Sequence, residues 1–211
     1  MPRAKICGLT TPATLDAAIA NGAAAVGFMF FPPSPRVLTF DRAAALAARV
    51  PAGTDRVGVF VDPDDALLDH AIAAARLTAL QLHGTVPERT AAIRRRTGLP
   101  VWATVSIRTR ADLDAAARYV GAADRLFYDA KTPDGADRPG GMGVRFDWAL
   151  LDGFRHPLPW LLGGGLDAGN VAEAIRSTGA PMVDVSSGVE SAPGVKDVDK
   201  IAAFLQSVAA S

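Results

Sequence analysis

The sequence is poor in several features, and each shortage excludes a class of protein. Only one cysteine occurs among 211 residues, which excludes an internal disulfide. No apolar run reaches the roughly 18 residues of a membrane-spanning helix, and no charged and then apolar leader is present. Lys plus Arg and Asp plus Glu both number 22, so no net charge attracts nucleic acid or an anionic membrane. We therefore expect a cytoplasmic protein that binds neither.

The length and composition favour one ordinary globular domain. With 211 residues, 49% of them hydrophobic, the chain can bury roughly 70% of the surface that it exposes when unfolded. No low-complexity tail, charge block or Pro/Ser-rich linker divides it. We expect a single domain over residues 1–211, with two smaller domains as the alternative.

What the chain does contain is a regular alternation of short apolar runs and amphipathic stretches. The expected strands cover residues 3–7, 24–30, 56–61, 79–83, 100–105, 125–129, 160–163 and 182–186. The expected helices cover residues 13–20, 41–50, 63–75, 87–97, 110–120, 146–152, 167–177 and 198–208. Polar residues at the expected N-caps are Thr11, Asp41, Asp62, Thr109 and Asp197, and prolines in the first turns are Pro12, Pro63 and Pro87.

Eight strand–helix pairs indicate the α/β class. Strands joined by right-handed helical crossovers run parallel, and eight such units close into a barrel. An open doubly wound sheet is the alternative, but it usually has a G-x-G-x-x-G turn after the first strand, and "ICGLTT" is not one. The sequence therefore predicts a (β/α)8 (TIM) barrel.

Glycine-rich loops follow three of the expected strands: "PGGMG" (139–143), "GGGLDAGN" (163–170) and "SSGVESAPG" (186–194). Most glycine turns are only connections, but in TIM barrels the loops after strands seven and eight tend to bind phosphate. Glycine lets backbone N–H groups approach an anion, and a helix expected to begin near Asp167 would add its positive end. The candidate residues for a phosphorylated small-molecule substrate are Gly141, Gly143, Gly164, Gly165, Ser187 and Gly188.

Strand alternation assigns the polar residues to faces of the barrel. The residues expected to face inward are Lys5, Cys7, Gln81, His83, Phe127, Asp129, Asp184 and Ser186. Because a closed barrel brings strand eight beside strand one, Lys5 and Asp184 are expected to pair beneath Cys7. An apolar interior is the rule, so titratable groups at strand ends indicate a site.

The candidate residues, together with Arg36 in the loop after the second expected strand, also have simpler interpretations. Cys7 alone would be a buried hydrophobe, or a nucleophile paired with His83. Asp129 could be a cap, Arg36 a solvated surface residue, and Lys5 with Asp184 a structural pair. His83 is expected to line the pocket as a hydrogen-bonding residue.

Ordered blocks from Lys5 to about Phe204 resemble the phosphoribosylanthranilate isomerase family of tryptophan biosynthesis. The blocks are "KICGLT", "GFMFFPPSPR", "VGVFV", "QLHG", "GGMG" with "FDW", "GGGL" with "NV", and "VDVSSGVE" with "PGVKD". The resemblance implies an Amadori rearrangement of an aminoaldose to an aminoketose, without metal or other cofactor. It also implies that Asp129 is the general acid, that Cys7 is the general base and that Arg36 contacts the anthranilate carboxylate.

One residue of the "PGGMG" loop departs from the family pattern. Met142 stands where the family often has threonine, which removes a hydroxyl but no backbone donor. The alternatives are another phosphosugar barrel enzyme, such as a histidine-pathway isomerase or indole-glycerol-phosphate synthase, and a non-catalytic phosphosugar-binding barrel. We expect a monomer or a homodimer, and His83, Asp184 and Arg36 among the substrate-binding residues.

Overall fold

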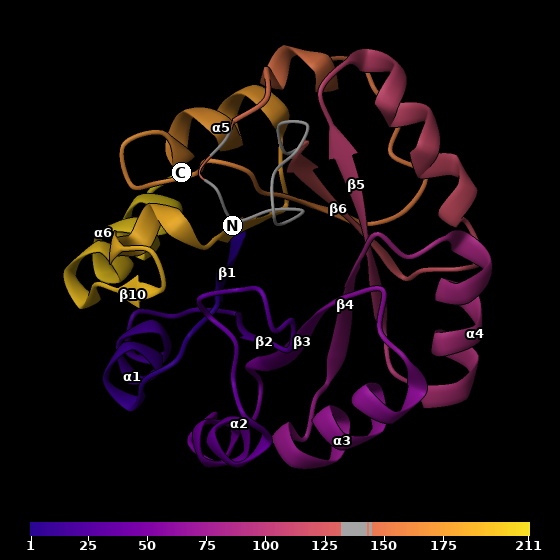
Figure 1. Ribbon diagram of the computed structural model, residues 1–211. Coiled ribbons are helices and arrows are strands. Elements are labelled where there is room, and N and C mark those ends of the chain that lie inside the picture. The colour runs from indigo at the N-terminus through magenta and orange to yellow at the C-terminus, as the bar shows by residue number, and fades with distance from the viewer. Residues whose placement is uncertain (132–142, 144) are drawn as a thin grey trace.

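A computed structural model of the chain describes residues 1–131, 143 and 145–211 (Figure 1). Its parallel strands form a closed barrel in chain order, and β8 pairs with β1, with Lys5 opposite Asp184. The strands are β1 (Arg3–Cys7), β2 (Ala25–Met29), β3 (Asp55–Val61), β4 (Ala79–His83), β5 (Val101–Ile107), β6 (Arg125–Ala130), β7 (Trp160–Leu162) and β8 (Met182–Val185). The predicted (β/α)8 barrel is confirmed.

Helices surround the barrel on its outside, as Figure 1 shows. The α-helices are α1 (Pro12–Ala20), α2 (Phe40–Ala47), α3 (Asp65–Ala75), α4 (Pro87–Thr97), α5 (Val171–Thr178) and α6 (Val198–Ala209). The 3-10 segments are η1 (Arg110–Tyr119), η2 (Trp148–Leu151) and η3 (Ser187–Val189). A small antiparallel pair, β9 (Glu190–Ala192) and β10 (Val195–Lys196), was not predicted. No helix in the described part of the chain has the length and apolar character needed to cross a membrane.

Two predicted helix starts are wrong. Thr39, not Asp41, is the N-cap of α2, and its side chain accepts a hydrogen bond from the backbone of Arg42. Asp62 has a φ of 40°, a left-handed turn that delays α3 until Asp64 caps it. Pro63 therefore precedes the helix and is not in its first turn. The other predicted caps and first-turn prolines are confirmed: Thr11, Thr109, Asp197, Pro12 and Pro87.

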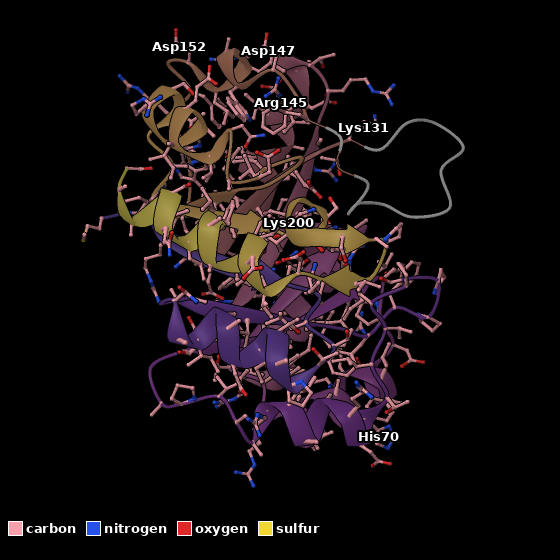
Figure 2. The ribbon with its side chains drawn as sticks, turned by 90° about the vertical axis from the view of Figure 1, so that its left-hand side faces the viewer. His70, Lys131, Arg145, Asp147, Asp152 and Lys200 are labelled. Atoms are coloured by element: carbon pink, nitrogen blue, oxygen red, sulfur yellow. The ribbon has the colours of Figure 1, made fainter. Side chains whose placement is uncertain are left out.

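Three predicted helices are shorter or of another type. Residues 110–120 form the 3-10 segment η1, in which the buried Leu113 and Ala116 are three apart and share one side. Residues 146–152 contract to η2, which Asp147 caps and Asp152 ends (Figure 2). Residues 167–170 form a turn in which Asp167 Oδ1 accepts hydrogen bonds from two backbone N–H groups. Consequently α5 begins only at Val171.

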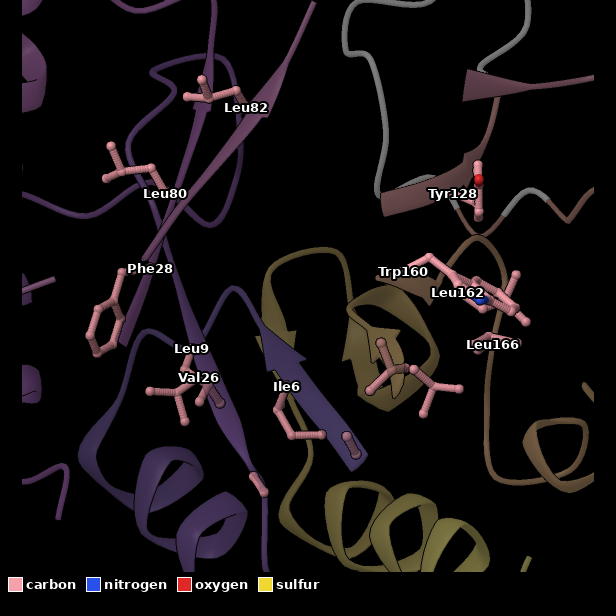
Figure 3. Close-up of a cluster of buried hydrophobic side chains, with 14 of the residues drawn as sticks. Ile6, Leu9, Val26, Phe28, Leu80, Leu82, Tyr128, Trp160, Leu162 and Leu166 are labelled. Carbon is pink, nitrogen blue, oxygen red and sulfur yellow. The ribbon is translucent and has the colours of Figure 1, made fainter. Parts of the chain in front are cut away.

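The core has two layers that follow the predicted alternation of the strands. Outward-facing residues such as Ile6, Phe28, Leu80 and Leu82 pack between the barrel and its helices (Figure 3). Inside the barrel lies a separate apolar cluster, the inner cluster: Ala25, Val57, Ala79, Trp102, Phe127, Leu161 and Met182. These residues precede the inward-facing polar residues on β4, β6 and β8, so the polar residues lie toward the carboxyl ends of the strands.

Candidate active site

A buried ion pair lies at the seam of the barrel. Lys5 Nζ donates to Asp184 Oδ1 at 2.6 Å, and the two side chains are 0% and 7% exposed. This pair was predicted from strand parity and closure, and it is confirmed. Burial lowers the pKa of Lys5, but Asp184 and the neighbouring Cys7 outweigh burial and raise it. Lys5 is therefore a fixed cation inside the barrel.

Cys7 lies beside Lys5 at the carboxyl end of β1 and is buried. Gly27, its partner on β2, makes room for both side chains: a Cβ there would lie 2.9 Å from the Cys7 sulfur and 3.1 Å from Lys5 Cε. Burial raises the pKa of the Cys7 thiol, while Lys5 and Lys196 act in the opposite direction. The two lysines thus favour the thiolate, but burial dominates, and the thiol is protonated at neutral pH.

Asp129 lies at the carboxyl end of β6, on the inner face as predicted, and is 7% exposed. Burial and then the charge of Asp184 raise the pKa of this carboxyl to about 7. Its Oδ1 accepts a hydrogen bond from the backbone of Ala130 at 2.9 Å. At Gly164, where φ is +84°, a Cβ would lie 3.1 Å from the same oxygen and 2.7 Å from Ala130 N. The loop after β7 therefore packs directly against Asp129.

The loops after β6, β7 and β8 meet at this end of the barrel. A Cβ on Gly165 would lie 2.9 Å from the carbonyl oxygen of Gly143, and one on Gly143 would lie 3.5 Å from Ser187 Oγ. A Cβ on Gly188 would lie only 1.9 Å from the carbonyl oxygen of Leu166, so this position requires glycine. Gly141 and Met142 lie outside the described residues.

The predicted contribution of a helix dipole at Asp167 needs correction. α5 begins four residues later, at Val171. The carboxylate of Asp167 occupies the approach to this helix, where it accepts hydrogen bonds from Gly169 N at 2.8 Å and Asn170 N at 3.1 Å. An anion at these loops would therefore depend on the glycine backbone more than on the start of α5.

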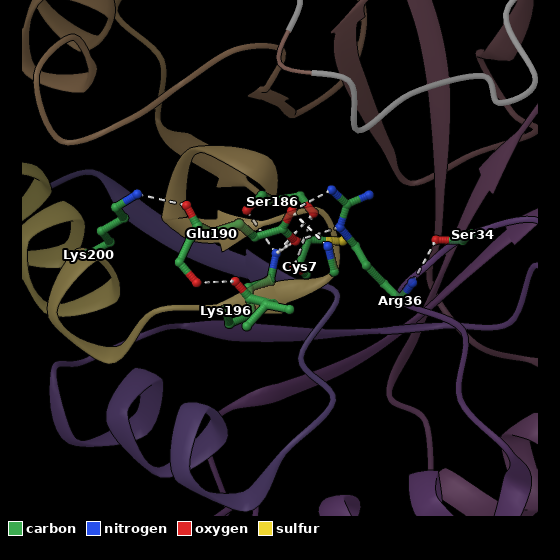
Figure 4. A network of polar contacts seen from close by, with 10 residues as sticks. Cys7, Ser34, Arg36, Ser186, Glu190, Lys196 and Lys200 are labelled. Carbon is green, nitrogen blue, oxygen red and sulfur yellow. Dashed lines mark hydrogen bonds and ion pairs between the residues drawn. The ribbon is translucent and has the colours of Figure 1, made fainter.

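Arg36 is not a solvated surface residue but part of a buried charge cluster (Figure 4). Its Nε and Nη2 donate to the two carboxylate oxygens of Glu190, at 2.7 and 2.8 Å. The aliphatic part of Arg36 crosses Gly8, where a Cβ would lie 2.5 Å from Arg36 Cδ. Because Gly8 follows Cys7, the guanidinium group is held close to the thiol end of β1.

Lys196 completes this cluster and connects it to β8. Its Nζ donates to Glu190 Oε1 at 2.7 Å and to the carbonyl oxygen of Ser186 at 2.8 Å. Burial raises the pKa of Glu190, but Arg36 and Lys196 outweigh it and lower that pKa to about 2. The sequence analysis missed Glu190 and Lys196, although both lie in blocks that resemble the family. One sequence signal could have identified them: an acidic and a basic residue lie six positions apart on either side of a glycine turn. The β9–β10 hairpin brings these two residues together.

His83 lies at the carboxyl end of β4 on the inner face and is 7% exposed. Its Nε2 lies 2.9 Å from Gln81 Nε2, and its ring meets Phe127 edge-on, with 5.9 Å between centroids. Burial and the charge of Lys5 lower the pKa of His83 to about 3. The imidazole is therefore neutral, in agreement with the prediction that it is a hydrogen-bonding residue of the pocket.

The fold and the site together define a TIM-barrel enzyme, because the buried ionisable residues gather at the carboxyl end of the barrel. The family described as N-(5'phosphoribosyl)anthranilate (PRA) isomerase matches residues 4–207. The N-(5'-phosphoribosyl)anthranilate isomerase of Paramagnetospirillum magneticum is 57% identical over 203 residues, which are 96% of this chain and 94% of that protein. This chain belongs to the PRA isomerase family.

Solved structures of the family have the same barrel. Phosphoribosyl anthranilate isomerase from Thermotoga maritima is 33% identical, with a TM-score of 0.89 and coverage of 100% of both chains. A second phosphoribosyl anthranilate isomerase structure, in complex with reduced 1-(o-carboxyphenylamino)-1-deoxyribulose 5-phosphate, has 32% identity and a TM-score of 0.84 and covers 100% of both chains. The family that the sequence blocks indicated is confirmed.

Proposed function

We propose that this protein converts N-(5'-phosphoribosyl)anthranilate into 1-(2-carboxyphenylamino)-1-deoxyribulose 5-phosphate in tryptophan biosynthesis. The proposal depends on one observation: a carboxyl group with a pKa of about 7 and a thiol lie at the same end of the barrel. Asp129 and Cys7 come from β6 and β1, with Lys5 and Asp184 beside them. An acid and a base on separate strands suit a reaction in which one atom of a sugar gains a proton and a different atom loses one.

In the first step Asp129 donates its proton to the ring oxygen of the ribose moiety. The bond from that oxygen to C1 breaks, and the nitrogen lone pair forms a protonated Schiff base. A carboxyl with a pKa of about 7 holds its proton in a large fraction of molecules near neutral pH, which an ordinary aspartate does not. Burial and Asp184 thus prepare Asp129 for the role of general acid.

In the second step Cys7 removes the proton from C2, and the electron pair of that C–H bond neutralises the Schiff base to give an enolamine. The enolamine then gains a proton at C1 and loses the proton of its C2 hydroxyl, which gives the ketone, so no electrons leave the substrate. The positive charge of the Schiff base favours the thiolate, as do Lys5 and Lys196. Substrate binding would therefore offset part of the burial effect on the thiol.

Binding is assigned to two regions on either side of the reacting groups. The glycine loops that contain Gly143, Gly164, Gly165, Ser187 and Gly188 would receive the phosphate. Arg36 would contact the anthranilate carboxylate through its Nη groups, because its Nε–Nη2 edge binds Glu190 and a guanidinium group can bind carboxylates along more than one edge. Glu190 and Lys196 hold Arg36 in a defined orientation before substrate arrives. We expect a cytoplasmic monomer or homodimer that needs no cofactor.

An activity assay tests the function directly. The substrate is made from anthranilate and phosphoribosyl pyrophosphate with the preceding transferase, and its fluorescence decay is followed. We expect the parent protein to accelerate the decay, and Cys7→Ser and Asp129→Asn each to lower kcat by at least ~100-fold, the usual scale for a lost acid or base. Absence of acceleration by the parent would reject the function. Turnover at the parent rate by either variant would reject the role of that residue.

A matched control separates loss of chemistry from loss of folding. Asp147 is an exposed aspartate that caps η2, and Asp147→Asn keeps a side-chain oxygen that can accept the same hydrogen bond. This variant makes the same chemical change as Asp129→Asn at an exposed position that the mechanism does not use. We expect it to retain the parent kcat, and all variants to keep the parent far-UV circular dichroism.

A further inference from the structure

Gln81 is a buried polar residue that the mechanism above does not use. It lies on the inner face of β4, two positions before His83, and is 1% exposed. Its amide nitrogen Nε2 lies 2.9 Å from His83 Nε2, whereas its oxygen Oε1 has no hydrogen-bond partner among the described residues. A buried amide that has a hydrogen bond at its nitrogen and none at its oxygen lowers the stability of the fold. Such a residue therefore requires an explanation, which a functional role can supply.

His83 is the group that this amide can control. The ring of Phe127 lies 5.9 Å from the His83 ring, between centroids, and 6.0 Å from Lys5 Nζ, and the charge of Lys5 acts on the imidazole. Burial and that cation keep the imidazole neutral. A neutral imidazole carries one proton, on either Nδ1 or Nε2, and the hydrogen bond at one nitrogen decides which.

The surroundings of Gln81 favour one orientation of its amide. With Nε2 toward the ring, the amide donates one hydrogen to His83 Nε2, the imidazole proton lies on Nδ1, and the second amide hydrogen and the carbonyl oxygen are unsatisfied. With the amide turned over, Oε1 would accept from His83 Nε2, and both amide hydrogens would lack that partner. Gln81 neighbours the inner cluster, where Ala79 and Trp102 offer no hydrogen-bond acceptors on their side chains. The two orientations therefore differ in one group: turning the amide over exchanges an unsatisfied carbonyl oxygen for an unsatisfied N–H, and unpaired buried N–H groups are the rarer of the two in native proteins.

We propose that Gln81 is a positioning residue that holds His83 in the Nδ1–H tautomer, so that His83 offers the substrate a hydrogen-bond donor. The identity of the substrate rests on the proposed function. His83 Nδ1 has no hydrogen-bond partner within the part of the chain that the structure describes. A donor at this position suits a hydroxyl or carbonyl oxygen of the sugar, whereas the other tautomer would set a lone pair against it.

The tautomer can be read without substrate by ¹H–¹⁵N spectroscopy of protein labelled in its histidine rings. The chain has three histidines, and the variants His70→Gln and His156→Gln assign the signals of His83 by elimination. We expect the parent His83 to show the Nδ1–H pattern and no titration between about pH 5 and pH 9. A parent spectrum with the proton on Nε2, or with a mixture of tautomers, would overturn the proposal.

Two substitutions of Gln81 test whether the amide causes this state. Gln81→Glu replaces the donor with a carboxylate that only accepts, and it should place a proton on His83 Nε2. Gln81→Met has a similar size and no polar atom, and it should give a mixture of the two tautomers. Trp148→Phe is the matched control, because Trp148 Nε1 is also buried without a partner in the residues that the structure describes but lies on η2, packed against the outer layer of the core. It should leave the His83 signals unchanged, and unchanged signals in both Gln81 variants would overturn the proposal.

Activity measurements then test whether the tautomer matters to the reaction. We expect Gln81→Glu to lower kcat/KM by at least ~10-fold and Gln81→Met by less, the scale of one unfavourable buried hydrogen-bond change. A parent kcat/KM in a Gln81→Glu protein with a changed tautomer would overturn the substrate-facing part. If Gln81→Glu does not fold, Gln81→Met carries both measurements. An inactive parent with the expected tautomer would instead refute the proposed function, which keeps the two failures distinct.

Discussion

The ammonium group of Lys5 lies 2.6 Å from the carboxylate of Asp184, across the seam where the last barrel strand meets the first. Burial is the largest influence on the pKa of both Cys7 and Asp129. In addition to burial, the charge of Lys5 lowers the pKa of Cys7, and the charge of Asp184 raises the pKa of Asp129. One buried ion pair therefore acts on both groups that we assign to proton transfer, and in opposite directions.

Removing only Lys5 should be strongly destabilising. Lys5→Met leaves the Asp184 carboxylate buried without its cation, and we expect the free energy of unfolding to fall by about 3–5 kcal/mol. The double variant Lys5→Met with Asp184→Leu removes both charges and should be more stable than Lys5→Met alone. Urea denaturation of the three proteins measures this. A Lys5→Met protein within about 1 kcal/mol of the parent would show that the pair contributes little.

The raised pKa of Asp129 predicts a pH dependence of stability with a definite sign. Between the unfolded value of 3.8 and the folded value of about 7, the native state retains a proton that the unfolded state has released. This group therefore makes the protein less stable as the pH rises through that window. Asp129→Asn cannot titrate, so its stability relative to the parent should increase by about 2–3 kcal/mol between about pH 5 and pH 8.

The measurement is urea denaturation of the parent and Asp129→Asn proteins in the same buffers. Comparing the difference between the two proteins cancels the contributions of other titrating groups, such as Glu190, whose low pKa acts only in acid. A difference that does not change with pH would mean that the carboxyl of Asp129 has an ordinary pKa in the folded protein.

The thiol of Cys7 should titrate late in the absence of substrate. Because Cys7 is the only cysteine, thiolate absorbance in the ultraviolet reports this residue alone. Its raised pKa predicts little thiolate at neutral pH and a titration whose midpoint lies above the ordinary value of 9.0. The Cys7→Ser protein supplies the baseline. Titration near pH 7 would instead indicate that Lys5 and Lys196 dominate over burial.

Gly188 should be indispensable to the loop after β8. In Gly188→Ala the new Cβ would lie 1.9 Å from the backbone oxygen of Leu166, which forces the loops after β7 and β8 apart. We expect KM to rise by ~10-fold or more, as for the loss of a hydrogen bond to a charged group. Gly169→Ala is the control, because its Cβ would approach only the Asp167 side chain, at 3.2 Å. Equal KM values in the two variants would argue against a phosphate site at these loops.

Helix boundaries show where reading the sequence reaches its limit. Both Thr39 and Asp41 are capable N-caps, as are Asp62 and Asp64, and the choice between them depends on the backbone of the preceding turn. Asp62, directly after β3, has a left-handed φ that the hydrophobic pattern of the sequence does not specify. The β9–β10 hairpin is similarly hidden, because its strands have only three and two residues.

The sequence by itself determined the barrel and the inward-facing residues of its strands. Strands have a period of two, so parity alone placed Cys7 and Asp129 inside once closure was inferred. Only the tertiary structure decided what surrounds these groups. Arg36 and Glu190 are 154 positions apart, and nothing local brings them together. The net pKa of Cys7 likewise depends on burial against charges from β1 and β10, a balance of opposing effects that exists only when the barrel has closed.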